Sequence, residues 1–226
     1  ASNMIAFLFA ILLLPIFSKL LKNNESINEI TFISFKILMA LSLTLFLVCY
    51  FFNNEIIQFR YTNGSFQDLD KILTESSMIL PVLMGCFVCV SSTYIFGTLL
   101  TANGNLRHLN YISLLGVIIN VLFNLILIPQ YGAFGSALTS LVTQFLVTII
   151  QIYFCFKFFK LYPFKDFFIP FFLFFIGLIL IGVITYELFA YWYINMFIFG
   201  FLSIIWSFLT QMIRFDYIKT IISNKI

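Results

Sequence analysis

Seven long apolar runs constrain the fold of this chain more than any other feature of its sequence. They cover residues 3–17, 30–52, 72–101, 109–128, 134–156, 167–189 and 192–213. A helix needs about 20 apolar residues to cross the hydrocarbon core of a bilayer, and every run except the first reaches that length. The connections are mostly short, which makes consecutive helices antiparallel neighbours. The sequence therefore predicts an all-α integral membrane protein with about seven transmembrane helices.

The composition indicates that lipid is the solvent of these runs. Hydrophobic residues make up 62% of the chain and charged residues 9%, whereas soluble domains carry roughly 25% charged residues. A soluble protein of this composition could not cover its own surface. The net charge of +3 is small and indicates no nucleic-acid partner. Membrane lipid is the partner that the composition implies.

The basic residues gather on one side of the predicted helices. When the connections are assigned to alternating sides, nine of the 12 bases fall on one side and two, Arg60 and Lys71, on the other. Lys36 lies near the basic end of its helix, where a long side chain can snorkel. Cytoplasmic loops are enriched in Lys and Arg, so we expect a cytoplasmic C-terminus, with residues 53–71 outside. The nine bases are Lys19, Lys22, Arg107, Lys157, Lys160, Lys165, Arg214, Lys219 and Lys225.

No pattern in the sequence indicates catalysis, a metal or a cofactor. Charged residues are absent from the middle of the predicted spans, and the only histidine, His108, lies solvated at a helix end without a partner for acid–base or metal chemistry. Cys86 and Cys89 have Cys-x-x-Cys spacing, but their apolar surroundings favour packing over a metal or redox pair. We therefore expect a protein that is not an enzyme and has no catalytic residues, metal ligands or cofactor.

Uncharged polar residues follow one face of the fourth predicted helix and two adjacent stripes of the fifth, because their spacings match the helical repeat. Such side chains either join helices through hydrogen bonds worth about 1 kcal/mol or line a water-filled cavity that admits a polar substrate. For serine and threonine we favour packing, whereas for Asn120 and Asn124 both interpretations stay open. The candidates for a cavity lining are Asn110, Ser113, Asn120, Asn124, Ser140, Thr143 and Gln144, and Ser136, Thr148 and Gln151 complete the stripes.

A stretch rich in small and turn-forming residues joins these two helices. Residues 127–137 read Leu-Ile-Pro-Gln-Tyr-Gly-Ala-Phe-Gly-Ser-Ala. Pro129 is predicted to end the fourth helix, because proline disfavours helical conformation in the residue before it. The small residues let the fifth helix start close against the fourth. Pro129, Tyr131, Gly132 and Gly135 thus form a predicted structural junction.

Three stretches of the sequence form recognisable motifs. They are Leu-Thr-Ala-Asn-Gly-Asn at residues 100–105, the pair Asn120-x-x-x-Asn124, and Ile-Pro-x-Tyr-Gly-x-x-Gly-Ser-Ala at residues 128–137. Together they resemble the C-terminal half of polysaccharide flippases, the Wzx-like members of the multidrug/oligosaccharidyl-lipid/polysaccharide (MOP) exporter superfamily. Residues 13–20 resemble the end of an earlier helix in the same family. The resemblance covers about residues 1–156 as the transport lobe. Residues 157–226 fit by position and hydrophobicity, as two further transmembrane helices and a short cytoplasmic tail.

The resemblance implies the C-terminal lobe of a two-lobed, MATE-like transporter that works by alternating access. Family members have 12 or 14 helices with cytoplasmic termini, and seven helices that start outside and end inside match helices eight to fourteen of the longer version. An N-terminal half is then expected to be missing, since the chain enters a short first run with no sign of a signal peptide. The implied substrate is a lipid-linked oligosaccharide, flipped across the bacterial cytoplasmic membrane for surface polysaccharide synthesis.

Three other functions are compatible with parts of the sequence. A multidrug or toxin cation antiporter of the same superfamily is the main alternative, but such proteins rely on buried carboxylates that are missing here at mid-depth. A flippase for the peptidoglycan precursor would be expected to show basic residues within the membrane, and only Lys36 comes close. A non-transporting scaffold would leave the junction at residues 128–137 unexplained. We therefore rank oligosaccharide flipping first.

Overall fold

A computed structural model describes residues 2–61, 69–162 and 165–214, and all regular structure in these ranges is helical. This architecture confirms the all-α membrane fold expected from the sequence. The helices are α1 (Ser2–Lys22), α2 (Asn28–Phe51), α3 (Asn53–Tyr61), α4 (Leu69–Ala102), α5 (Leu106–Phe159), α6 (Lys165–Tyr186) and α7 (Trp192–Leu209).

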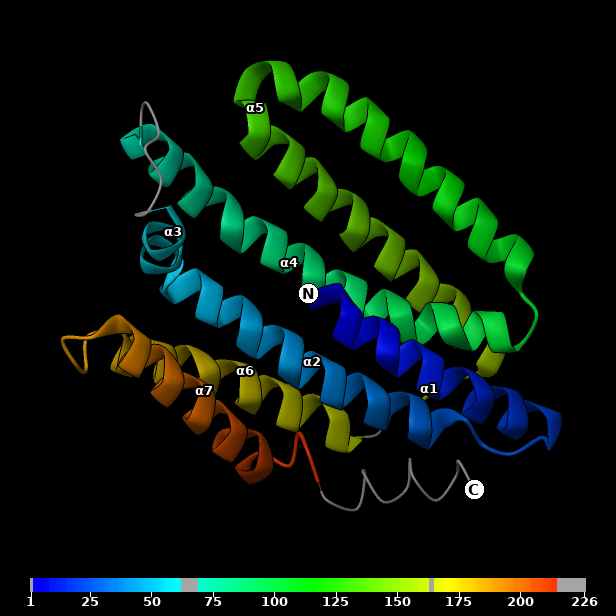
Figure 1. Cartoon of the computed structure of the whole chain (residues 1–226). Helices are drawn as coiled ribbons and strands as arrows, with labels where there is room; N and C mark the ends of the chain where they lie inside the picture. The colour runs from blue at the N-terminus through cyan, green and yellow to red at the C-terminus, as the bar shows by residue number, and fades with distance from the viewer. Residues whose placement is uncertain (1, 62–68, 163–164, 215–226) are drawn as a thin grey trace.

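Within the described ranges, six helices are long and apolar enough to cross a membrane. One of them, the 54-residue α5, folds back on itself at Gly132 into a first arm (residues 106–131) and a second arm (residues 133–159), as Figure 1 shows. At 1.5 Å per residue each arm is about 40 Å long, enough to cross a hydrocarbon core of about 30 Å. The seven predicted runs therefore correspond to five single helices and two arms.

The reversal between the arms of α5 lies later in the chain than predicted. Helical structure continues past Pro129, and the turn is made at Gly132, whose φ of 56° and ψ of −131° are rarely open to residues with a side chain. A proline removes one backbone donor and restricts the residue before it, yet the arm accommodates it within one turn of its end. The prediction that Pro129 ends the helix is wrong, and the glycine ends it instead.

A short helix, α3, occupies part of what was expected to be a connection between spans. Phe52, with φ of −110° and ψ of 27°, bends the chain at the end of α2, and Asn53 Nδ2 donates to the carbonyl of Tyr50 at 3.0 Å. Helix α3 then packs against α4. The polar composition of residues 53–61 concealed this helix, because it has no apolar run and buries no residue fully.

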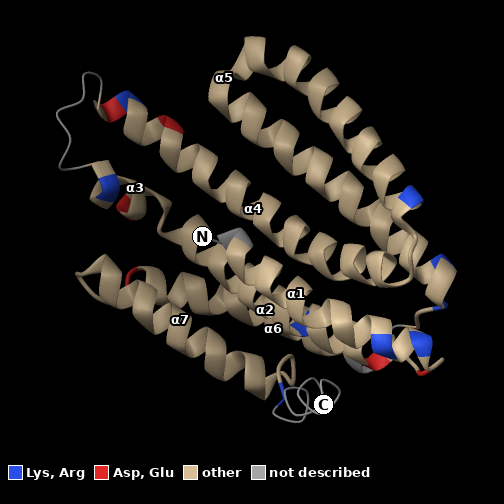
Figure 2. Cartoon of the chain, turned by 45° about the vertical axis from the view of Figure 1, so that its right-hand side comes forward, with Lys and Arg blue, Asp and Glu red and all other residues tan. Residues whose placement is uncertain are grey.

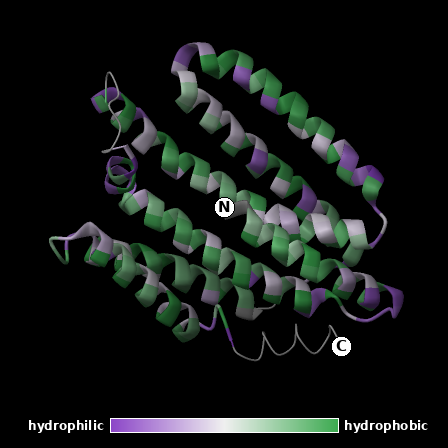
Figure 3. Ribbon diagram, in the orientation of Figure 1, coloured by the Kyte–Doolittle hydropathy of each residue, from purple (hydrophilic) through white to green (hydrophobic). Residues whose placement is uncertain are grey.

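Helix α4 is the centre of the packing, since α1, α2, α3 and α5 all contact it, while α2 also contacts α6 and α7. Hydrophobic residues make up most of the helices, and hydrophilic residues occur at helix ends and within α5 (Figure 3). Two buried clusters hold the bundle together. The first joins α1, α2, α4 and the end of α5 through residues such as Phe17, Phe32 and Phe96, and the second joins α2, α6 and α7 through residues such as Phe174 and Phe199.

Charged residues lie mainly near the ends of the helices (Figure 2). Lys36 was predicted to snorkel at a helix end, but its side chain is buried, with only 5% of its surface exposed. Helix α2, which carries Lys36, contacts α4, α6 and α7. The cytoplasmic C-terminus stays a prediction. The tail beyond Arg214, with Lys219 and Lys225, and the side chain of Lys165 lie outside the described residues.

Candidate functional site

The two arms of α5 meet through amide and hydroxyl side chains. Asn120 Nδ2 donates to Thr143 Oγ1 across the arms at 3.4 Å, and Asn124 Nδ2 donates to Asn120 Oδ1 at 2.9 Å. Nearby, a Cβ on Gly116 would lie 2.9 Å from Val147 Cγ2, so the glycine is what allows the arms to approach. The predicted pair of asparagines thus lies together, beside the second arm.

One atom of this group has no partner. Asn124 Oδ1 is enclosed and makes no hydrogen bond within the described chain. An enclosed acceptor left unpaired costs about 1–3 kcal/mol. The bond from Asn120 explains how the asparagines join the arms, but it does not account for this oxygen. A role of the pair in contacting substrate therefore remains a prediction.

The other predicted polar residues divide into three environments. Asn110 and Ser113 are exposed on the first arm. Ser140 Oγ donates to the carbonyl of Ser136 at 3.0 Å, so this hydroxyl is satisfied within its own helix. Gln144 instead lines a groove, which brings it close to residues of other helices. The predicted set is therefore not a single lining, and only part of it meets a cavity.

This groove lies between α1, α4 and both arms of α5 and has a volume of about 510 Å³. We call it the α4–α5 groove. Its lining mixes hydroxyl, amide and apolar side chains, and no lining residue carries a charge. The lining residues are Phe7, Ala10, Val90, Thr93, Tyr94, Gly97, Thr98, Thr101, Leu109, Gln144 and Gln151.

Hydrogen bonds fix the wall of the groove where α4 meets the second arm of α5. The hydroxyls of Thr93 and Thr148 lie 2.9 Å apart, and Thr148 Oγ1 lies 3.0 Å from the carbonyl of Cys89 and 2.7 Å from that of Gln144. Thr148 is buried. The two helices are therefore joined by polar contacts at a depth where the rest of both helices is largely apolar.

The contribution of α4 to this groove was missed in the sequence. Thr93, Gly97 and Thr101 follow one another at intervals of four, which places them on one face of α4. That spacing was the available signal. It is also the usual pattern of close helix packing in membranes, so hydropathy alone could not distinguish a groove from a helix contact.

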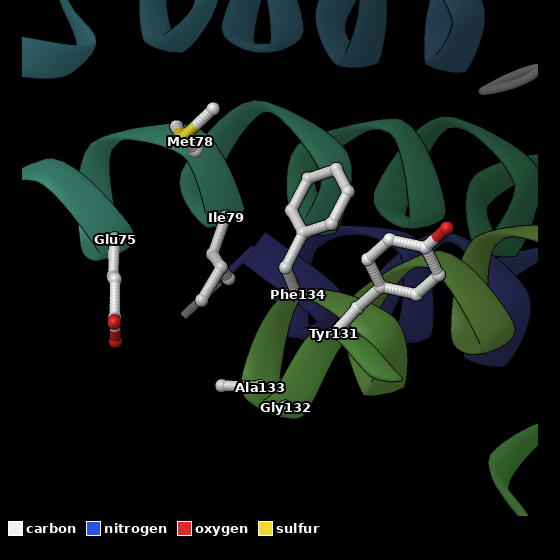
Figure 4. A pocket seen from close by; sticks show the side chains of 7 residues that line it. All are labelled: Glu75, Met78, Ile79, Tyr131, Gly132, Ala133 and Phe134. Carbon is white, nitrogen blue, oxygen red and sulfur yellow. The ribbon is translucent and has the colours of Figure 1, made fainter. Parts of the chain in front are cut away.

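Within the predicted junction, the backbone is closely packed at Gly135. Gly135 is buried, and a Cβ there would lie 2.8 Å from the carbonyl carbon of Leu127 and in contact with its oxygen. Tyr131 and Gly132 line a second cavity of about 270 Å³ beside the N-terminal part of α4. Figure 4 shows Phe134 extending from this turn towards α4, near Ile79. Glu75 is the one charged residue of that lining.

The remaining candidates for chemistry do not assemble into a centre. Cys49, Cys86, Cys89 and Cys155 are free thiols. His108 is half-buried rather than solvated, because its ring packs on Phe154 and Phe158 at centroid distances of 5.3 and 4.9 Å. Among the described residues, no group of three or more His, Cys, Asp and Glu side chains could hold a metal ion.

Comparison with known protein families finds a match over most of the chain. The model of a family described as the lipid II flippase MurJ matches residues 1–212. No curated protein and no solved structure matches the chain.

Proposed function

The chain belongs to the MurJ family of lipid II flippases, and from that premise we propose that it moves the sugar-bearing head of lipid II across the cytoplasmic membrane along the α4–α5 groove. Flipping a lipid-linked precursor is the activity of this family, which lies within the MOP superfamily. In this proposal the polyprenyl tail stays in lipid while the head group crosses the bundle.

The observation that carries the proposal is an uncharged polar groove inside an otherwise apolar bundle. Moving a hydroxyl or amide into hydrocarbon without a hydrogen bond costs roughly 2–7 kcal/mol, and a saccharide carries several such groups. Threonine hydroxyls and glutamine amides offer these groups partners without introducing charge. A groove of this chemistry therefore lowers the barrier for the sugar part of the head group, whereas its lining offers no basic partner for the diphosphate.

We further propose that these helices form one lobe of a larger, two-lobed transporter, the C-terminal lobe that the motif resemblance implies. The described groove has walls from α1, α4 and α5, and a facing lobe would supply the remaining wall. Alternating access then follows from relative movement of the lobes, which exposes the groove to one side of the membrane at a time.

A polysaccharide precursor of the Wzx type is the second candidate substrate. It is favoured by the absence of charged side chains from the α4–α5 groove, since a neutral lining fits any lipid-linked glycan and does not select the peptide-bearing head of lipid II. The cation antiporter is less favoured, because this groove contains no carboxylate for coupling to a cation.

Complementation with the full-length protein distinguishes these substrates. We expect it to restore growth to a strain depleted of its own lipid II flippase, and not to restore surface polysaccharide to a strain lacking its polysaccharide flippase. The reverse pattern would establish the Wzx-type substrate. If the protein restored neither growth nor surface polysaccharide although it was present in the membrane at normal abundance, flipping of either precursor would be contradicted.

A further inference from the structure

The side chain of Gln151 is the unusual feature of the α4–α5 groove. It lies on the second arm of α5, lines the groove, and has only 4% of its surface exposed. Its Oε1 is enclosed and has no hydrogen-bond partner within the described chain. Buried amides in proteins are normally paired, and an unpaired acceptor is costly. This amide therefore has an unused acceptor at the edge of a polar cavity.

A glycine on α4 makes room for this amide. A Cβ added to Gly97 would lie 3.4 Å from Gln151 Oε1 and 3.9 Å from its Nε2. These are ordinary van der Waals distances, so a methyl group would fit but would occupy the space beside the carbonyl oxygen. The terminal torsion of glutamine has a broad, roughly two-fold energy profile. With glycine at position 97, the amide has space to turn about that bond.

The neighbouring hydroxyls are already engaged. Thr98 Oγ1 donates to the carbonyl of Tyr94, Thr101 Oγ1 donates to the carbonyl of Gly97 at 2.8 Å, and the hydroxyl of Thr93 pairs with that of Thr148. Their protons are therefore used within the protein. Gln151 differs from these three in offering both an unpaired carbonyl and an amide that can donate.

We propose, on the basis of the proposed function, that Gln151 is the residue of this groove that forms hydrogen bonds with the uncharged sugar part of the substrate. When its amide turns into the groove, the carbonyl accepts a proton from a sugar hydroxyl or an acetamido N–H, and the amide nitrogen donates to a sugar oxygen. The diphosphate is not its ligand, because no basic side chain lines the groove to balance that charge. Gly97 acts as a positioning residue by leaving space for the amide to turn.

Three variants of the full-length protein test this role. Gln151→Leu removes the amide at similar volume, and Gly97→Ala leaves the amide in place but fills the space beside it. Gln130→Leu is the matched control, because it makes the same change on the same helix at an exposed position outside the groove. The probes are purified lipid II and a polyprenyl diphosphate that carries no sugar, and the measurement is the dissociation constant of each.

We expect Gln151→Leu to weaken binding of lipid II about tenfold, which corresponds to one or two lost hydrogen bonds. Binding of the sugar-free diphosphate should not change. Gly97→Ala should weaken lipid II binding in the same direction while the melting temperature stays equal or rises, because alanine favours a helix over glycine. The control variant Gln130→Leu should bind both probes with the same dissociation constants as the wild-type protein.

Two results would overturn the role of Gln151. If Gln151→Leu weakened binding of both probes equally, Gln151 would be a structural residue. If it left the affinity for lipid II unchanged, Gln151 would not belong to the binding site. The proposed function would stand in either case. If the wild-type protein bound lipid II no more tightly than the sugar-free diphosphate, the choice of lipid II as substrate would fail, and the sugar contact with it.

Discussion

Asn124 and Asn120 combine two functions that are usually separate, helix joining and an open hydrogen-bonding capacity. Asn120 spans the two arms of α5 by a long bond to Thr143, and Asn124 adds a shorter bond to Asn120. Among the residues that the structure describes, the side-chain carbonyl of Asn124 has no partner. A bond of 3.4 Å between donor and acceptor lies beyond the usual range and is weak. The two side chains are therefore held in place, while part of their hydrogen-bonding capacity is not used within the described residues.

We predict that Asn120→Leu and Asn124→Leu in the full-length protein lower export of the lipid-linked glycan and leave abundance and melting temperature nearly unchanged. The reason is that each change removes only one well-formed hydrogen bond, the one between the two asparagines. Asn124→Leu also removes an enclosed oxygen that has no partner within the described residues. Thr143→Val is the control, because it deletes the partner of Asn120 and leaves both amides. If abundance falls in step with export, the pair is structural.

At Gly132 the backbone conformation alone predicts that a side chain would destabilise the protein. Its φ of 56° and ψ of −131° are strained for any residue with a Cβ, although nothing lies within 4 Å of where that atom would be. We expect Gly132→Ala to destabilise the full-length protein by about 1–3 kcal/mol, measured as a lower melting temperature. Gly200→Ala is the matched control, since Gly200 has equally open surroundings and no positive φ. An equal response of both variants would contradict the conformational explanation.

At the scale of the helical elements, the turn between α6 and α7 depends on a single amide. Asn195 is 2% exposed, accepts a hydrogen bond from the backbone N–H of Phe189 at 3.0 Å, and donates to the carbonyls of Tyr186 and Phe189 at 3.1 and 2.9 Å. The first turn of α7 thus holds the end of α6. A similar arrangement fixes the start of α2, where Asn28 exchanges two hydrogen bonds with the backbone of Tyr162.

We predict that Asn195→Ala lowers the stability of the bundle by about 2–4 kcal/mol, because it leaves a donor and two acceptors of the turn without their partner. Thermal unfolding of the purified full-length protein measures the change. Asn23→Ala is the comparison, since Asn23 is exposed and its side chain donates to the neighbouring Glu25 rather than to the backbone of another helix. A loss of similar size at both positions would show that the turn is not what Asn195 stabilises.

Hydropathy predicted the helical elements well and their ends less well. Each of the seven apolar runs became a helix or an arm, because runs of this length can satisfy their backbone in lipid only as helices. Helix α3 and the exact reversal of α5 were missed. The first has no apolar run, and the second depends on the φ of Gly132 rather than on the nearby Pro129, which is the stronger signal in a sequence. Local conformation at one residue overrode the pattern.

At the scale of the whole molecule, the expected flippase class of the MOP superfamily is confirmed by family membership, whereas the Wzx type and the lobe position stay proposals. The α4 side of the groove could not be predicted, because Thr93 and Thr101 in an apolar run read equally well as helix packing. Which helices enclose a cavity depends on their arrangement in space. Spacing on one helix does not contain that information.

The distribution of basic residues makes a prediction for the whole bundle. Cysteines at Asn54 and Lys160, both exposed in the structure, are placed one at a time in a full-length protein that lacks other cysteines. On intact cells an impermeant thiol reagent should label position 54 and not position 160, because the basic side of a membrane protein faces the cytoplasm. Permeabilised cells, in which both should react, provide the control. Labelling of position 160 alone would reverse the orientation.

The hairpin of α5 packs chiefly on α4, while α2 makes its contacts with α4, α6 and α7. This packing suits a rigid-body tilt of the hairpin about α4. A small tilt would widen or narrow the groove against α1 and would leave the packing of α2 with α6 and α7 unchanged. Most of this movement would take place on the α4 surface, where Gly85, Gly97 and the pairing of Thr93 with Thr148 lie. It would also shift the end of α5 against α2, where Phe156 packs on Phe32.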